Sequence, residues 1–164
     1  SVIVPEVSSE RRRYIPMGFI GPETFCSNKV RLIPDGTLYH LGVLSSQFHN
    51  AWMRVVAGRL EMRYNYSAGI VYNTFIWPDC DESARKAVSD CAQLVLDART
   101  LFGDASLADL YDPNNAIYFP GLVKAHEALD AAVEAAYGVD FGGDEERIVA
   151  HLFELYTEKT KGKE

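Results

Sequence analysis

The chain has 164 residues, of which 48% are hydrophobic and 24% are charged, and its formal net charge is −7. A chain of this size can remove roughly 70% of its unfolded surface from water, so one or two small folded domains are expected. No apolar run reaches the ~20 residues that a membrane-spanning helix needs. The N-terminus also lacks the charged and apolar pattern of an export signal.

Cysteine usage predicts a reduced protein. The three cysteines, Cys26, Cys80 and Cys91, are odd in number and lack the paired spacing of metal ligands. We therefore expect free thiols and a cytoplasmic location. Because the sequence begins without Met, we also expect it to be a piece of a longer polypeptide.

The charge is divided unequally along the chain. Residues 1–78 hold eight Lys/Arg and five Asp/Glu, a balance of +3, whereas residues 79–164 hold eight Lys/Arg and eighteen Asp/Glu, a balance of −10. A basic region can face the phosphates of a nucleic acid, and an acidic region avoids them. The sequence therefore indicates two regions with different roles, residues 1–78 and residues 79–164.

The first region is expected to begin with strands. β-branched residues predict a strand over residues 1–7, which Pro5 restricts to an edge or a strand end. Further strands are predicted over residues 11–20 and 28–33. The apolar run 38–44 closes this strand-rich part.

One helix and two more strands are predicted next. Ser45 and Ser46 offer a hydroxyl cap to a helix whose apolar stripe runs over residues 48–56. Strands are predicted over residues 59–66 and 70–76, joined by a short turn. Alternation along the first strand would place four polar side chains on one face: Arg59, Glu61, Arg63 and Asn65. We expect the aromatic residues here to lie in the core rather than to stack on single-stranded bases: Tyr64, Tyr66, Tyr72, Phe75 and Trp77.

Beyond residue 78 the pattern changes to helix. Apolar stripes predict one helix from a cap at Asp81 or Ser83 to Leu101, and others over residues 121–137 and 144–156. Three amphipathic helices with short connections indicate a small bundle.

The predicted fold class is therefore α+β, a mixed strand-and-helix segment followed by a small helical bundle. The tail, residues 159–164, is expected to fray.

Long strings of residues carry a resemblance to a known family. TLYHLGVLSSQFHNAWMRVVAGRLEMRYNYSAGIVYNTFIWP (residues 37–78) resembles the target-recognition region of MmeI-like DNA methyltransferases. LVLDARTLFGDASLADLYDP (94–113) and LVKAHEALDAAVEAAYG (122–138) resemble the C-terminal helical region of that family. The match extends over nearly the whole chain.

The resemblance implies the C-terminal part of an enzyme that methylates adenine at N6 within a restriction-modification system, often with an endonuclease. It implies double-stranded DNA as a partner. It also implies a missing N-terminal catalytic domain of the same polypeptide that binds S-adenosylmethionine and flips the adenine out of the duplex. The chain itself lacks the Asn-Pro-Pro-aromatic motif and any Gly-rich phosphate loop. We therefore expect no catalytic residue, cofactor or metal site in this part; the histidines are isolated: His40, His49, His126 and His151.

Glu61 and Arg63 occupy positions where that family carries a Glu-x-Arg or a Lys-x-Asp pair, a choice that sets the orientation of one G·C pair. Arginine can bind guanine O6 and N7, and glutamate can accept from cytosine N4 in the major groove. From spacing alone, a surface ion pair is the simpler interpretation; the resemblance favours base readout. Asn65 stands where relatives often carry a basic residue, and asparagine can pair with adenine.

Six basic side chains are candidates for phosphate contacts, which position a protein on DNA without selecting sequence: Arg11, Arg12, Arg13, Lys29, Arg31 and Arg59. For the run of three arginines, a solvated strand start is an equal alternative. Two other functions stay open for the chain. One is a specificity subunit that serves a separate catalytic subunit, and the other is a protein–protein interaction module that does not touch DNA.

Overall fold

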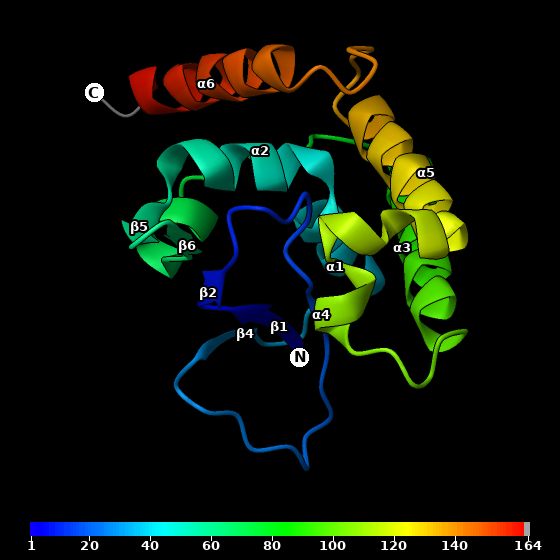
Figure 1. Cartoon of the computed structure of the whole chain (residues 1–164). Helices are drawn as coiled ribbons and strands as arrows, with labels where there is room; N and C mark the ends of the chain where they lie inside the picture. The colour runs from blue at the N-terminus through cyan, green and yellow to red at the C-terminus, as the bar shows by residue number, and fades with distance from the viewer. Residues whose placement is uncertain (163–164) are drawn as a thin grey trace.

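Two small antiparallel sheets lie within residues 1–65, and helices make up most of the chain that follows (Figure 1). The structure, a computed structural model, describes residues 1–162. The fold is α+β, as the sequence predicts. In the described residues, no helix combines the length and the apolar character that crossing a membrane requires.

The first sheet is built around β1 (Val2–Pro5), which pairs with β3 (Gly18–Phe19) on one side and β4 (Val30–Ile33) on the other. Pro5 lies at the end of β1, as expected for a residue that cannot donate to the ladder. After Glu6 the chain enters β2 (Val7–Ser8), which belongs to the second sheet.

The strand predicted over residues 11–20 is wrong for most of its length, because only the β3 residues pair with another strand. The chain before β3 packs against helices instead. Tyr14 donates to the Asp130 carboxylate at 2.5 Å, and the Ile15 amide donates to Asn50 Oδ1 at 2.8 Å. Side chains from distant parts of the sequence therefore provide hydrogen-bond partners for this segment, which does not pair as a strand.

The second sheet has the order β2 (Val7–Ser8), β6 (Arg63–Asn65), β5 (Gly58–Leu60). The single strand predicted over residues 59–66 is wrong, because the chain reverses at Glu61 and Met62 and forms a hairpin. The predicted alternation of faces fails as well. The two turn residues interrupt the strand, so side chains before and after the turn no longer alternate as in one continuous strand.

The apolar run 38–44 forms a helix, α1 (Leu38–Ser45), and not part of a strand-rich segment. Its residues from Leu41 onward are all buried, and a helix buried on every side shows no apolar stripe. The next helix, α2 (Gln47–Val56), begins after Ser46 as predicted. The Ser46 hydroxyl donates to the Val43 carbonyl at 2.6 Å, however, and does not cap α2.

The strand predicted over residues 70–76 is also wrong. The segment begins in η1 (Ala68–Tyr72), a π-helical turn. Ser67 caps this turn, because its Oγ accepts from the Ile70 amide. Of the five aromatic residues expected in the core, Tyr72 and Trp77 are half-buried against it and the other three are buried: Tyr64, Tyr66 and Phe75.

The three long helices predicted beyond residue 78 are confirmed: α3 (Glu82–Thr100), α5 (Pro120–Ala136) and α6 (Glu145–Lys161). The short helices α4 (Leu107–Leu110) and η2 (Pro113–Tyr118) connect α3 to α5. Residues 159–161 belong to α6 and not to a frayed tail, and residues 163–164 lie outside the described residues.

Helix packing joins the two regions. α3 packs against α5 and also against α1, whereas α6 lies alongside α2 (Figure 1). The helices therefore do not form a bundle confined to residues 79–164. Residues from both regions contribute to one buried apolar cluster, so the position of the hairpin depends on the helices beneath it.

Candidate nucleic-acid interface

The β5–β6 hairpin carries the three residues predicted to contact bases, and it projects at the side of the molecule away from α3 and α5 (Figure 1). Arg63 Nη2 lies 3.0 Å from Glu61 Oε2, and the two side chains are 47% and 78% exposed. Both groups therefore remain open to a partner. An exposed ion pair of this kind contributes less than about 1 kcal/mol to folding.

The backbone of Glu61 holds the carboxylate at the tip of the turn. Its φ is 58°, in the left-handed region that costs a residue with a side chain roughly 1–2 kcal/mol. Glycine would adopt this conformation without that cost. The chain thus has a carboxylate at a position where local conformation favours glycine.

The register of the hairpin assigns each side chain to a face. Arg59 is opposite Tyr64, and Leu60 is opposite Arg63. Cross-strand partners project on the same side of a sheet, so Arg59 lies on the face opposite Arg63. The predicted common face for the two arginines is therefore wrong. Asn65, two residues after Arg63 on β6, shares the face of Arg63 and is half-buried.

Arg59 is held by contacts within the hairpin. Its guanidinium carbon lies 3.9 Å from the centroid of the Tyr64 ring, and Nη1 donates to the Met62 carbonyl at 3.1 Å. The cation–π contact orients the guanidinium while the residue as a whole stays exposed. A phosphate can therefore reach a side chain that is already ordered.

Glu6 brings Lys29 and Arg31 to the end of the hairpin sheet. Its amide donates to the Lys29 carbonyl at 2.9 Å, and its carbonyl accepts from the Tyr66 amide at 2.7 Å. The Glu6 carboxylate pairs with Arg31 Nη2 at 2.7 Å. Lys29 is exposed and precedes β4, so the predicted strand carries only Arg31 of the two.

The arginine run follows β2 in a turn, in which the Arg12 amide donates to the Ser9 carbonyl at 3.2 Å. Arg11 is exposed, and Arg12 is half-buried. Arg13 differs from both, because its side chain borders a hollow on α5 that is lined by acidic residues: Glu127, Asp130 and Glu134. Those carboxylates would repel a phosphate, so this position is less favourable for DNA than its two neighbours.

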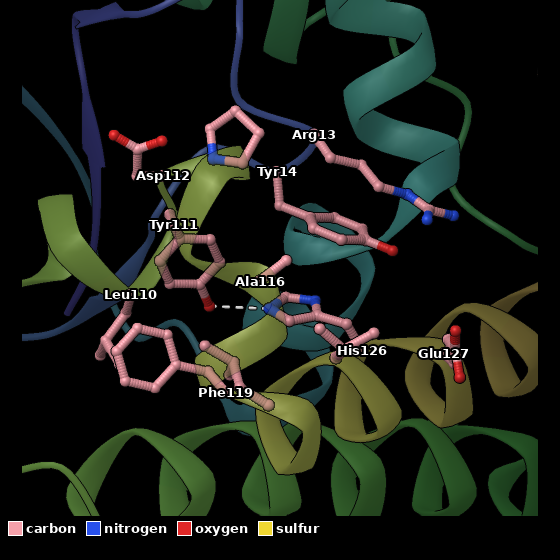
Figure 2. A pocket seen from close by; sticks show the side chains of 12 residues that line it. Arg13, Tyr14, Leu110, Tyr111, Asp112, Ala116, Phe119, His126 and Glu127 are labelled. Atoms are coloured by element: carbon pink, nitrogen blue, oxygen red, sulfur yellow. Dashed lines mark hydrogen bonds between the residues drawn. The ribbon is translucent and has the colours of Figure 1, made fainter.

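The Arg13–Tyr14 segment is anchored to α5 by buried polar groups (Figure 2). The Tyr14 ring stacks on His126 with centroids 4.1 Å apart, and His126 Nε2 lies 2.7 Å from the Tyr111 hydroxyl. Burial, and then the nearby charge of Arg99, lowers the pKa of His126 to about 3, so its imidazole is neutral at pH 7. Burial raises the pKa of Asp130 to about 6, against the lowering effect of the hydrogen bond from Tyr14.

A second anchor joins α2 to α6. Arg54 makes two bonds to the Glu145 carboxylate, from Nε at 2.7 Å and from Nη2 at 3.0 Å, while Nη1 donates to the Arg13 carbonyl at 2.9 Å. Sequence reasoning missed Arg54, Asp130 and Glu145 because their partners are distant along the chain. Without coordinates, no local pattern indicates such pairs.

Across residues 1–162, no three His, Cys, Asp or Glu side chains are grouped closely enough to hold a metal ion. The apolar hollow in Figure 2, beside Tyr111 and His126, has a volume of about 210 Å³. Cofactor sites typically occupy about 300–1,000 Å³. The acidic hollow beside Arg13 is larger than the apolar one, at about 520 Å³.

Comparison with known proteins agrees with the resemblance of the three strings. Residues 1–79 match the family MmeI, target recognition domain, and residues 80–163 match the family MmeI, C-terminal domain. The chain is 44% identical over 163 residues to DNA methyltransferase A of Bacillus subtilis (strain 168), which covers 98% of this chain and 18% of that protein.

A solved structure is similar over the same region. It is that of the type IIL restriction-modification enzyme MmeI in complex with DNA, with a TM-score of 0.93 and 44% identity over 98% of this chain and 21% of that chain. The chain belongs to the MmeI family, and it comprises the target recognition domain and the C-terminal domain. It spans about one fifth of the length of each of these two relatives.

Proposed function

We propose that this chain is the part of an adenine-N6 DNA methyltransferase that selects the DNA sequence to be modified. Three findings support the proposal: the match to a target recognition domain, a similar protein named as a DNA methyltransferase, and a similar structure solved with DNA. In the complete enzyme, the rest of the polypeptide would bind S-adenosylmethionine, flip the adenine out of the duplex and transfer the methyl group.

The observation that carries the proposal is the exposed Glu61–Arg63 pair at the tip of a projecting hairpin. The guanidinium of Arg63 would bind guanine O6 and N7, and the carboxylate of Glu61 would accept from cytosine N4. Because the two groups lie 3.0 Å apart, both can reach one G·C pair. A bidentate contact of this kind discriminates against the wrong base by about 1–3 kcal/mol.

Asn65 would contact a different base. It lies two residues after Arg63 on the same face of β6, and two residues of strand span about 6.8 Å. Successive bases on one strand are about 3.4 Å apart along the helix axis. A side chain displaced by this distance reaches beyond the pair bound by Arg63, where an amide can pair with adenine N6 and N7.

Basic side chains around the hairpin would contact phosphates and orient it in the groove. Arg59 is ordered on its tyrosine, and Lys29 and Arg31 lie beside the sheet. Arg11 and Arg12 follow β2, which pairs with β6; Arg13 is assigned the same role, in competition with the acidic side chains beside it.

We assign DNA contact to residues 1–78 and a bracing role to residues 79–164. The second region carries a balance of −10, which opposes close approach to phosphates. Its helices α3 and α6 instead support α1 and α2 beneath the recognition surface. No step of methyl transfer is assigned to these residues, because the sequence lacks the Asn-Pro-Pro-aromatic motif that the family uses for it.

The test exchanges the charges of the proposed base-reading pair in the full-length enzyme, with Glu61→Lys combined with Arg63→Asp. Methylated adenines are then mapped by sequencing the DNA of a host that carries the intact gene. We expect methylation to continue at sites in which one G·C pair has the opposite orientation. The physical reason is that lysine binds guanine and aspartate accepts from cytosine in the exchanged arrangement.

A matched control exchanges another exposed ion pair, Lys86→Asp with Asp90→Lys, whose partners lie 2.6 Å apart on α3. This control should leave the methylated site unchanged. If the hairpin exchange also leaves the site unchanged, base readout by Glu61 and Arg63 is excluded. Binding to duplex DNA without dependence on salt would instead favour an interaction module, because phosphate contacts release counterions.

A further inference from the structure

Two apolar side chains at the tip of the hairpin are open to solvent. Leu60 is 47% exposed and Met62 is 72% exposed, whereas Tyr64 and Tyr66 in the same stretch are buried. A single exposed leucine on a protein surface is ordinary. The position of Leu60 relative to Arg63 distinguishes it.

Leu60 and Arg63 are direct cross-strand partners in the β5–β6 register. Residues in such a pair have Cβ atoms about 4.5–5.5 Å apart and project on the same face. Leu60 therefore lies immediately beside the guanidinium proposed to bind guanine. In the proposed complex, an apolar side chain would therefore lie next to the bound guanine.

The chemistry of the major groove restricts what such a side chain can recognise. Base edges there present nitrogen and oxygen donors and acceptors, and among the four ordinary bases only thymine presents an apolar group, its C5 methyl. Against any other base, Leu60 would cover a polar edge without bonding to it, which is unfavourable. Charge favours DNA as the partner here, because Arg63 shares the face of Leu60 and Arg59 precedes Leu60 on β5.

We propose that Leu60 contacts the C5 methyl of a thymine in the base pair next to the one bound by Glu61 and Arg63, and thereby selects an A·T pair at that position. The inference rests on the proposed function and deepens it. It predicts that, in the methylated site, an A·T pair adjoins the G·C pair bound by Glu61 and Arg63.

The test uses the full-length enzyme after its methylated site has been mapped and the G·C position has been identified by the charge exchange. Duplex substrates carry either thymine or uracil at the adjoining pair, which removes only the methyl group. For the unmodified enzyme, we expect uracil to lower kcat/KM for methylation about fourfold, the effect of one buried methyl. With Leu60→Ala, the thymine and uracil duplexes should be methylated at equal rates.

The matched control is Leu94→Ala, at a leucine on α3 whose exposure, 52%, is similar to that of Leu60. This variant should retain the fourfold preference for thymine. The proposal is overturned if G·C pairs adjoin the identified position on both sides. It is equally overturned if uracil has no effect, or the same effect in the Leu60→Ala enzyme. In each of these outcomes the response to the charge exchange is unaffected, so the failure of this inference is distinct from failure of base readout by Glu61 and Arg63.

Discussion

The Arg63 guanidinium lies 3.0 Å from the Glu61 carboxylate, although both side chains are open to solvent at the end of a hairpin. In water such a pair contributes less than about 1 kcal/mol. The pair therefore adds little to folding, and it holds a donor fork and an acceptor at a fixed separation. Under the proposed function, this fork and this acceptor would bind the edge of a single G·C pair.

Arg63→Ala separates the two roles of this side chain. We expect the free energy of unfolding to change by less than about 0.5 kcal/mol, since the residue is exposed. Methylation of the natural site by the full-length enzyme should fall about 5- to 150-fold, the equivalent of about 1–3 kcal/mol of base discrimination. The measurements are chemical denaturation of the 164-residue chain and kcat/KM of the enzyme. A large loss of stability would show that Arg63 acts structurally.

Glu61→Gly tests the backbone of the turn. Because φ at Glu61 is 58°, glycine should relieve local strain and stabilise the chain by up to about 1 kcal/mol, even though the ion pair is lost. The same change removes the acceptor for cytosine, so discrimination at the G·C position should weaken. Thermal unfolding and mapping of methylated sites measure the two effects. Destabilisation by more than the value of a surface ion pair would contradict this account of the turn.

Gly42→Ala tests the contact between the two regions. A Cβ at Gly42 of α1 would lie 2.7 Å from Val88 Cγ1 and 3.2 Å from the Ala92 Cβ on α3. Overpacking of this kind typically destabilises a protein by about 1–3 kcal/mol. The control, Gly121→Ala, places its Cβ in open space within α5. It should leave the free energy of unfolding unchanged or raise it by up to about 1 kcal/mol.

Arg54→Ala tests the anchor between α2 and α6. The side chain is only 17% exposed, and it makes two bonds to Glu145 and a third to the Arg13 carbonyl. Because Glu145 is 42% exposed and screened by solvent, we expect a loss of about 1–2 kcal/mol and not the full value of a buried pair. The control is Lys86→Ala, which breaks an exposed pair on α3, and it should cost less than about 0.5 kcal/mol. Equal effects in urea denaturation would contradict the anchor.

The buried histidines should make the chain less stable in acid. Burial lowers the pKa of both His49 and His126 from 6.5 to about 3, so the unfolded chain binds protons that the folded chain excludes. Stability from each histidine is fully present above pH 6.5 and is lost as the pH falls toward 3, by about 1.4 kcal/mol per pH unit. Asp130 acts oppositely: its pKa is raised from 3.8 to about 6, so its contribution decreases as the pH rises through that interval.

His126→Gln isolates one of these contributions, because glutamine does not titrate and can still hydrogen-bond to Tyr111. The variant should be less stable than the unmodified chain at pH 7.5, since it loses the stack on Tyr14. Between pH 6 and 4, the free energy of unfolding of the variant should fall less steeply than that of the unmodified chain. The difference between the two slopes should be about 1.4 kcal/mol per pH unit. The opposing effect of Asp130 is present in both proteins and cancels in the difference. Parallel curves from denaturation at several pH values would contradict the assignment.

The helical spacing of apolar residues predicted the long helices that have one side exposed to solvent. The amphipathic stripes of α3, α5 and α6 are visible in the sequence because solvent lies on one side of each helix. The helix α1 was misassigned because it is buried on every side, which removes the contrast between faces. The hairpin was predicted as one strand because its turn consists of Glu61 and Met62, which lack the glycine or asparagine that signals a turn.

The sequence by itself determined the α+β class, the long helices, the division of charge and the family. These properties reside in local residue patterns and in long strings of residues that resemble the family. Only the tertiary structure decided that Glu61 stands at the tip of a turn, that Arg59 and Arg63 lie on opposite faces, and that Leu60 adjoins Arg63. Strand register depends on which backbone groups pair across the hairpin, and a reversal of the chain changes every face assignment after it.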